Sequence, residues 1–261
     1  RLSRSPAKVA AVQVEIWSDV VCPWCAVGRA RFQQALADFA HADEVEIRWR
    51  SFELDPSAPR LREVSQRDHL ATKYRRTPDE AQAMLDQMTA TAAEVGLEFR
   101  FDRARAGNTL DAHRLLHLAF ERGGSALQDA VKDRFLTGYL RDGEPIGEVA
   151  ALTRLAVEAG LDEADVTEVL AGERFTDEVR EDETQARVLG ISGVPFFVLD
   201  ARYGVSGAQP AEVLLGALQQ AWQERSPLTI VGGSTGHAAA TDGDGHDHPA
   251  GDACSGDSCA V

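Results

Sequence analysis

Two cysteines separated by two residues are the feature of this sequence that most clearly could do chemistry. Cys22, Pro23, Trp24 and Cys25 form a C-x-x-C motif. The residues before it, 12–16, alternate apolar and polar, which predicts a strand. The residues after it have helical spacing with one broad apolar face. The dithiol is therefore expected at a strand-to-helix turn, with Cys22 at the helix N-terminus, where free N–H groups stabilise a thiolate.

This placement predicts a redox pair. Cys22 would attack a disulfide and Cys25, one turn further on, would resolve the mixed disulfide. Pro23 suits the first helical turn because its missing N–H costs little there. The alternative is that the motif is half of a zinc site, which needs two further ligands. The strand before and the helix after favour the redox interpretation, and no metal is assigned to this site.

A second cysteine pair lies near the end of the chain. Cys254 and Cys259 form C-x4-C in a tail rich in Gly, Ala, Asp, Ser and His, with too few apolar residues to fold alone. Three interpretations stay open. The pair is an auxiliary redox couple that exchanges with the first dithiol across a flexible tether, a soft-metal site with the tail histidines, or incidental. The histidines are His237, His246 and His248.

The charge of the chain limits its partners. The 261 residues include 27 Lys and Arg against 42 Asp and Glu, for a formal net charge of −15. Such a surface repels phosphate backbones, so nucleic acid is not expected as a partner. No apolar run is long enough to cross a membrane, and no membrane partner is expected. The basic N-terminus lacks the long apolar region of a secretory signal, so we expect a cytoplasmic protein.

The elements around the dithiol predict two groups of strands, separated along the chain by a long helical segment. Residues 45–52 alternate again, so the opening reads as a parallel βαβ unit. Residues 62–188 look almost wholly helical, with Thr77 as an N-cap before Pro78. A strand hairpin follows over 195–207. The remaining expectations are an end to one helix at Gly123-Gly124, helices at about 125–138, 147–159, 163–171, 175–189 and 210–223, and a short extended piece at 97–99.

The two ends can share one mixed sheet, with the helices as an insertion between them. The predicted domains are a sheet domain of 10–60 with 190–225, a helical domain of 61–189, and a flexible tail of 226–261. Pro195 stands at the start of the hairpin, where a proline is tolerated. Taken alone, it does not show a cis bond.

The motifs in combination resemble a known family. The Cys22–Cys25 motif after a first strand, with Gly193-Val194-Pro195 before a hairpin, looks like the thioredoxin superfamily, and the long helical block resembles the DsbA family. Three segments resemble its FrnE-type subgroup: Ser18 to Cys25, Phe52-Glu53-Leu54, and Asn108-Thr109 with Ala112-His113-Arg114-Leu115. The resemblance covers roughly residues 12–223. It implies an α/β thioredoxin fold, a βαβ…ββα mixed sheet with a large all-helical insertion, and thiol–disulfide oxidoreductase or isomerase activity.

The resemblance also implies roles for particular residues. It implies a cis bond at Val194-Pro195 that faces the dithiol, with Pro195 beside Cys22 and Cys25 as the catalytic set. Pro23, Trp24 and Val194 would contact the substrate. Asn108 and His113 match the subgroup motif and are candidates for lining the groove; the alternative for His113 is a satisfied helix histidine.

Other functions remain open within the resemblance. Related glutathione-dependent isomerases of 2-hydroxychromene-2-carboxylate and kappa-class glutathione transferases carry Ser where this chain has Cys22. The intact pair favours exchange with protein thiols and disulfides or with glutathione, which stays open as a co-substrate; no other cofactor is implied. The periplasmic oxidases carry His where this chain has Trp24, so a strongly oxidising potential is not expected. The alternatives are a glutathione-linked isomerase or transferase of small aromatic compounds, and a redox or metal-stress binding protein that uses the tail. The sequence does not indicate the oligomeric state.

Overall fold

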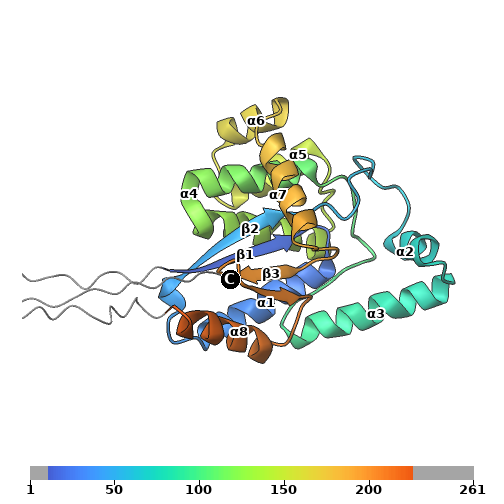
Figure 1. The fold of residues 1–261 in the computed structure, drawn as a ribbon. Helices are drawn as coiled ribbons and strands as arrows, with labels where there is room; N and C mark the ends of the chain where they lie inside the picture. The colour runs from blue at the N-terminus through green and yellow to red at the C-terminus, as the bar shows by residue number, and fades with distance from the viewer. Residues whose placement is uncertain (1–10, 226–261) are drawn as a thin grey trace, which may run out of the picture. The chain divides into compact units, whose positions relative to one another are not determined.

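A mixed four-stranded sheet forms the centre of the protein. The computed structural model describes residues 11–225. Within them the strands are β1 (Val12–Ser18), β2 (Val45–Ser51), β3 (Phe196–Leu199) and β4 (Tyr203–Ser206). Their order across the sheet is β2-β1-β3-β4, with β1 parallel to β2 and antiparallel to β3 (Figure 1). This confirms the thioredoxin-type sheet, built from the two ends of the described chain.

Strand β1 is two residues longer than its alternating pattern predicts. Val14 and Ile16 are buried on one face, as expected, but Trp17 is fully buried on the other face and Ser18 pairs with Ser51 of β2. Both faces of β1 are covered by helices, so polarity does not mark the end of the strand. Hydrogen bonding to β2 keeps Ser18 in the ladder, and the chain turns only after it.

Helices cover both faces of the sheet. On one face lie α1 (Pro23–Ala37) and α8 (Ala211–Gln223), and α4 (Leu110–Thr137) and α7 (Thr176–Val188) lie on the other (Figure 1). The core between α1 and the sheet includes Phe32 and Phe197, whose ring centroids are 5.4 Å apart. The carboxyl end of β1 lies beside the start of β3, since Trp17 pairs with Phe196. This register brings the C-x-x-C turn next to Pro195.

The segment between β2 and β3 is helical, as the sequence predicts. Its remaining helices are α2 (Gln66–Tyr74), α3 (Pro78–Glu94), α5 (Val149–Glu158) and α6 (Glu163–Ala171). Thr77 caps α3 in a capping box with Glu80, as expected for the N-cap. Gly123 and Gly124 interrupt α4 with non-helical backbone, and the chain continues as a helix beyond this kink. A π-helical turn, Gly138–Asp142, follows α4, and a 3-10 turn, Ala42–Glu44, precedes β2. Residues 97–99, expected as a short extended piece, are neither helix nor strand.

Candidate active site

The dithiol lies where β1 passes into α1. Cys22 is the N-cap of α1, with an extended backbone, and Pro23 is the first helical residue. The N–H of Cys25 donates to the carbonyl of Cys22 at 3.1 Å, which places Cys25 one turn into the helix. Both cysteines are free thiols and buried, but only Cys22 lines a cavity open to solvent. Cys22 is therefore the sulfur that a substrate can reach, at the positive end of the helix dipole.

The pKa values of the two thiols shift in opposite directions. Burial tends to raise the pKa of Cys25, but the hydrogen bond with Cys22 and the charge of Lys132 outweigh it, so that pKa is lowered. The pKa of Cys22 is raised well above its usual value by the hydrogen bond with Cys25, by burial and by charge repulsion within the pair. The first proton thus leaves the pair readily and the second with difficulty. The resulting single negative charge belongs to the pair rather than to one sulfur.

A buried lysine lies behind the dithiol. The ammonium of Lys132, on α4, is fully buried and donates to the carbonyl of Ser18 at 3.3 Å. It also lies 5.4 Å from the ring centroid of Trp49. Burial lowers the pKa of Lys132 to about 8, although the charges of Cys25 and Asp19 act against this shift. Near neutral pH the site therefore contains a buried cation that favours one thiolate in the pair.

An acidic residue lies in the turn between β1 and Cys22. Asp19 Oδ1 lies 3.3 Å from Nε2 of His113, and Oδ2 accepts the Leu54 N–H at 2.8 Å. Burial tends to raise the pKa of Asp19, but the hydrogen bond and charge of His113 lower it overall. Asp19 is therefore a buried carboxylate three residues before Cys22. Its negative charge raises the pKa of Cys22, which opposes the effect of Lys132 on the pair.

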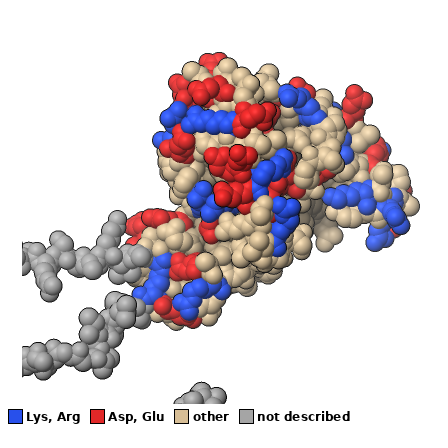
Figure 2. Space-filling model, turned by 45° about the horizontal axis from the view of Figure 1, so that its top comes forward, with Lys and Arg blue, Asp and Glu red and all other residues tan. Residues whose placement is uncertain are grey.

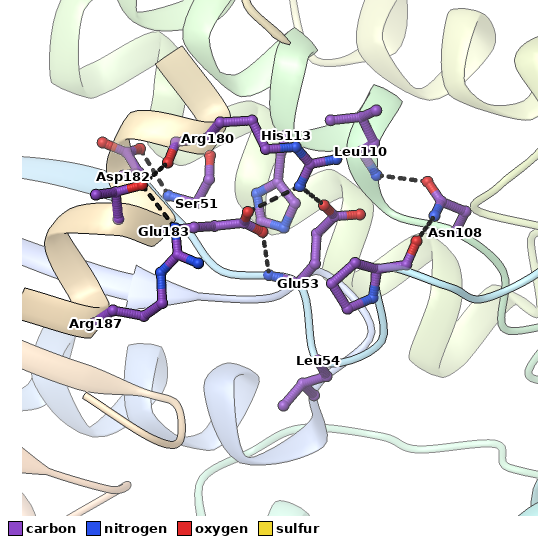
Figure 3. A network of polar contacts seen from close by, with 12 residues as sticks. Ser51, Glu53, Leu54, Asn108, Leu110, His113, Arg180, Asp182, Glu183 and Arg187 are labelled. Atoms are coloured by element: carbon purple, nitrogen blue, oxygen red, sulfur yellow. Dashed lines mark hydrogen bonds and ion pairs between the residues drawn. The ribbon is translucent and has the colours of Figure 1, made fainter. Parts of the chain in front are cut away.

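A polar network holds the segment that follows β2 (Figure 3). The side chain of Glu53 is fully buried and accepts from Arg180 of α7. The Glu53 N–H donates to Glu183 at 3.4 Å. Asp182 accepts the Ser51 N–H at 2.8 Å. Burial raises the pKa of Glu53, although Arg180 acts against the shift. These contacts fix residues 51–54 against α7, and so fix the backbone that binds the Asp19 carboxylate.

The Val194-Pro195 loop faces the dithiol. The peptide bond between these residues is cis, as the resemblance implies. The carbonyl of Val194 accepts from the Cys22 thiol at 3.7 Å. Pro195 packs on α1 at Gly28, where a Cβ atom would lie 2.7 Å from its Cγ. The absence of a side chain at Gly28 therefore lets the loop approach the dithiol.

We expect Gly28→Ala to separate the loop from the dithiol. The added methyl group must displace Pro195, and this displacement should lower the free energy of unfolding by about 1–3 kcal/mol. Because the Val194-Pro195 loop then lies further from Cys22, disulfide exchange should also be slower. Gly216→Ala is the matched control, because Gly216 also lies inside a helix and its Cβ would meet nothing within 4 Å. It should gain about 1 kcal/mol from helix propensity. Denaturant unfolding and exchange rates measure both effects, and equal stability gains in the two variants would contradict the close packing.

A cavity of about 470 Å³ opens beside Cys22. It lies between the dithiol, the segment after β2, and the hairpin of α2 and α3. Its lining includes Pro23, Trp24 and Val194 beside Cys22, four of the residues that the sequence proposes for the site. Both methionines of the chain also line it. A substrate that reaches Cys22 through this cavity therefore enters between the start of α1 and this helical hairpin.

Asn108 and His113 lie behind the cavity and do not line it. Asn108 donates to the carbonyl of Pro56 at 3.1 Å and accepts the Leu110 N–H at 3.0 Å, so it joins a loop to the start of α4. His113 is fully buried against Asp19. Their contact with a substrate stays a prediction. In this structure they position other groups of the site.

The tail lies outside the described residues, and Cys254, Cys259 and the three tail histidines with it. In residues 11–225, no three His, Cys, Asp or Glu side chains are grouped so that they could hold a metal ion. In the same range, no helix is long and apolar enough to span a membrane.

Sequence reasoning did not find Lys132. Its signal is the spacing of Gln128, Lys132 and Leu136, which recur every four residues on the buried face of α4. A lysine on such a face must find a partner or neutralise. The methionines of α3, Met84 and Met88, were missed as well, although their spacing places them on one face of the helix.

The fold and the site together define a thioredoxin-fold protein with an accessible dithiol. Residues 13–219 match the family model of the DSBA-like thioredoxin domain. The protein belongs to this family, as its motifs predicted. Assignment to the FrnE-type subgroup stays a prediction.

Several known proteins resemble this chain. A probable DsbA oxidoreductase of Streptomyces coelicolor is 47% identical, with a TM-score of 0.78 over 88% of this chain and 100% of that one. The uncharacterized protein YwbO of Bacillus subtilis is 28% identical over 194 residues, which are 72% of this chain and 86% of YwbO. A cytosolic disulfide reductase of Pseudomonas aeruginosa, DsbM, shares the fold at 18% identity, with a TM-score of 0.59 over 81% of this chain and 99% of DsbM.

Proposed function

We propose that the protein is a thiol–disulfide oxidoreductase or isomerase that works through a mixed disulfide on Cys22. One observation carries this proposal: a reachable Cys22 at the start of α1 faces the Val194 carbonyl, with Cys25 one turn behind it. A dithiol in this position has an activated sulfur and a resolving sulfur on one rigid element. The family supports the same general activity.

The reaction follows from the two sulfurs. The Cys22 thiolate attacks one sulfur of a substrate disulfide, a new S–S bond forms, and the other substrate sulfur leaves as a thiolate that takes up a proton. Cys25, deprotonated, then attacks Cys22 and releases the second substrate thiol. The substrate is reduced and the Cys22–Cys25 pair is oxidised to a disulfide. Two molecules of a thiol such as glutathione restore the dithiol by the reverse exchange and leave as their own disulfide, and isomerisation needs only the first step and its reversal.

The test is a reversible dithiol couple in glutathione redox buffers. Wild-type protein should interconvert between dithiol and disulfide, with a potential nearer the value of about −270 mV for a reductase than the value of about −120 mV for an oxidase. Cys25→Ser should accumulate a covalent adduct with glutathione or a peptide at Cys22, detected by intact mass. If Cys22 and Cys25 do not interconvert reversibly between dithiol and disulfide, the proposal fails, and a glutathione-linked isomerase or transferase becomes the favoured function.

The partners that fit this site are protein thiols and disulfides or glutathione. The glutathione option has support from DsbM, a protein of similar fold that has been solved with GSH. We also propose a cytoplasmic location, since DsbM is described as cytosolic. Fractionation of cells that express the protein at its natural level would test the location.

A further inference from the structure

The polar lining of the cavity has unused donors and no unused carboxylates. The hydroxyl of Tyr139 and Nε of Arg62 are buried without a partner among the described residues, and both residues line the cavity. The two carboxylates of the lining are engaged, Asp19 with His113 and Asp55 with Arg62 at 2.8 Å. Buried donors without partners are costly. A ligand that suits this lining must therefore supply acceptor oxygens.

The helical hairpin beside the cavity begins with a basic segment, although the chain as a whole is acidic. Residues 62–76 contain five cations and two acids, against a net charge of −15 for the whole chain. The cations are Arg62, Arg67, Lys73, Arg75 and Arg76, of which Arg62 and Lys73 line the cavity. Three of them form ion pairs with neighbours, whereas Lys73 and Arg75 have no ion pair within residues 11–225. Lys and Arg atoms gather at the tip of the projection that Figure 1 draws as α2 and the start of α3 (Figure 2).

The charge of this basic segment affects its own histidine, His69. His69 lines the cavity beside Lys73. Burial lowers the pKa of His69, and the cations Arg62 and Lys73 lower it further, while Asp55 has a smaller effect in the opposite sense. The part of the cavity wall around His69 is therefore a positive environment.

The same cavity exposes large apolar side chains. Trp24, Leu54, Tyr74 and Met84 are 39–51% exposed, and all four line it. Several large exposed apolar side chains that line one cavity are typical of an interaction site. Met84 and Met88 are flexible enough to adapt to different side chains. The lining thus suits a ligand with apolar side chains close to acceptor groups.

We infer that this cavity binds an extended segment of an acidic polypeptide, with its disulfide at Cys22, apolar side chains against α3 and a carboxylate at Lys73 and Arg75. This inference rests on the proposed function and names its substrate class. A polypeptide fits better than glutathione, because a small zwitterionic thiol also presents an ammonium group. That group would need a carboxylate, and both carboxylates of the lining are engaged.

The experiment compares matched disulfide peptides with the full-length reduced protein. Each peptide carries one cysteine joined to a fluorescent reporter thiol, next to the same leucine, and the peptides differ only in two flanking residues, Glu, Gln or Lys. At low ionic strength the Glu peptide should react about tenfold faster than the Lys peptide, and in molar salt the advantage should fall to about twofold as the charges are screened. The Gln peptide should lie between them.

Charge variants test which residues set the preference. Lys73→Gln with Arg75→Gln should remove it, and Lys73→Glu with Arg75→Glu should reverse it. Arg122→Glu with Arg154→Glu is the matched control, because these residues lie outside the cavity lining in surface ion pairs that contribute little. The control should keep the wild-type preference.

Four results would overturn the inference, and one of them separates it from the proposed function. Equal rates for all three peptides would refute the acidic substrate while leaving thiol–disulfide exchange intact. No exchange with any peptide would instead refute the proposed function, and the inference with it. If the glutamate variant accelerated every peptide alike, the occupant would be the chain's own aspartate-rich C-terminal segment. If the glutamate variant reacted more slowly with oxidised glutathione by the same factor as with the Glu peptide, the occupant would be a small anionic thiol.

Discussion

Cys22→Ser is expected to lower the rate constant for disulfide reduction by at least about a thousandfold, because a serine hydroxyl has almost no anion at neutral pH. Cys22 is the one sulfur of the pair that lines the cavity. Cys25 is fully buried and does not replace it. Cys25→Ser should still release one thiol from the first substrate molecule and then stop, since nothing resolves the mixed disulfide.

Stopped-flow release of a reporter thiol separates these two outcomes. Without added reductant, wild type should release both thiols of one substrate disulfide per molecule, Cys25→Ser should release only the first, and Cys22→Ser should release neither. The wild-type rate should level off below the pH at which an ordinary thiol ionises, because the first proton leaves the pair readily. A Cys22→Ser protein that keeps its unfolding transition and half of its exchange rate would show that the reactive sulfur lies elsewhere.

The sequence predicts the elements that carry the dithiol better than the contacts that tune it. The C-x-x-C motif sits between an alternating strand and a helix, and these local patterns place Cys22 at the helix N-terminus. The end of β1 is misplaced by two residues, because burial of Trp17 and pairing of Ser18 depend on helices and strands far along the chain. Local periodicity contains no information on such contacts.

The same limit applies to the charged groups. Asp19 is part of the recognisable motif, but its partner His113 comes from α4, 94 residues away. Lys132 lies on an otherwise apolar helical face, so a mismatch is visible in the sequence, whereas its proximity to Ser18 is not. The unused donors of Tyr139 and Arg62 are visible only once every neighbouring acceptor is placed.

Lys132→Met is expected to stabilise the protein and to make its dithiol a weaker oxidant. Burial holds the pKa of Lys132 at about 8 instead of 10.5, so the folded protein binds this proton more weakly than the unfolded chain. The cost to the free energy of unfolding is on the order of 3 kcal/mol. It is fully present below pH 8 and is relieved as the pH rises from about 8 to 10.5. Methionine fills a similar volume and has no charge to bury.

Lys132 also affects the reduction potential of the dithiol. The ammonium of Lys132 lowers the pKa of Cys25 and so stabilises the reduced pair as a thiolate. Without it the disulfide form is relatively favoured, and the reduction potential should become more negative. Urea unfolding between pH 6 and 10 and equilibrium with glutathione measure both changes. Lys73→Met is the matched control, since Lys73 is exposed on α2 and should alter neither the stability nor the potential. If Lys132→Met lost stability at pH 7 and left the potential unchanged, the lysine would serve packing alone, and the thiolate of the pair would depend on the helix N-terminus by itself.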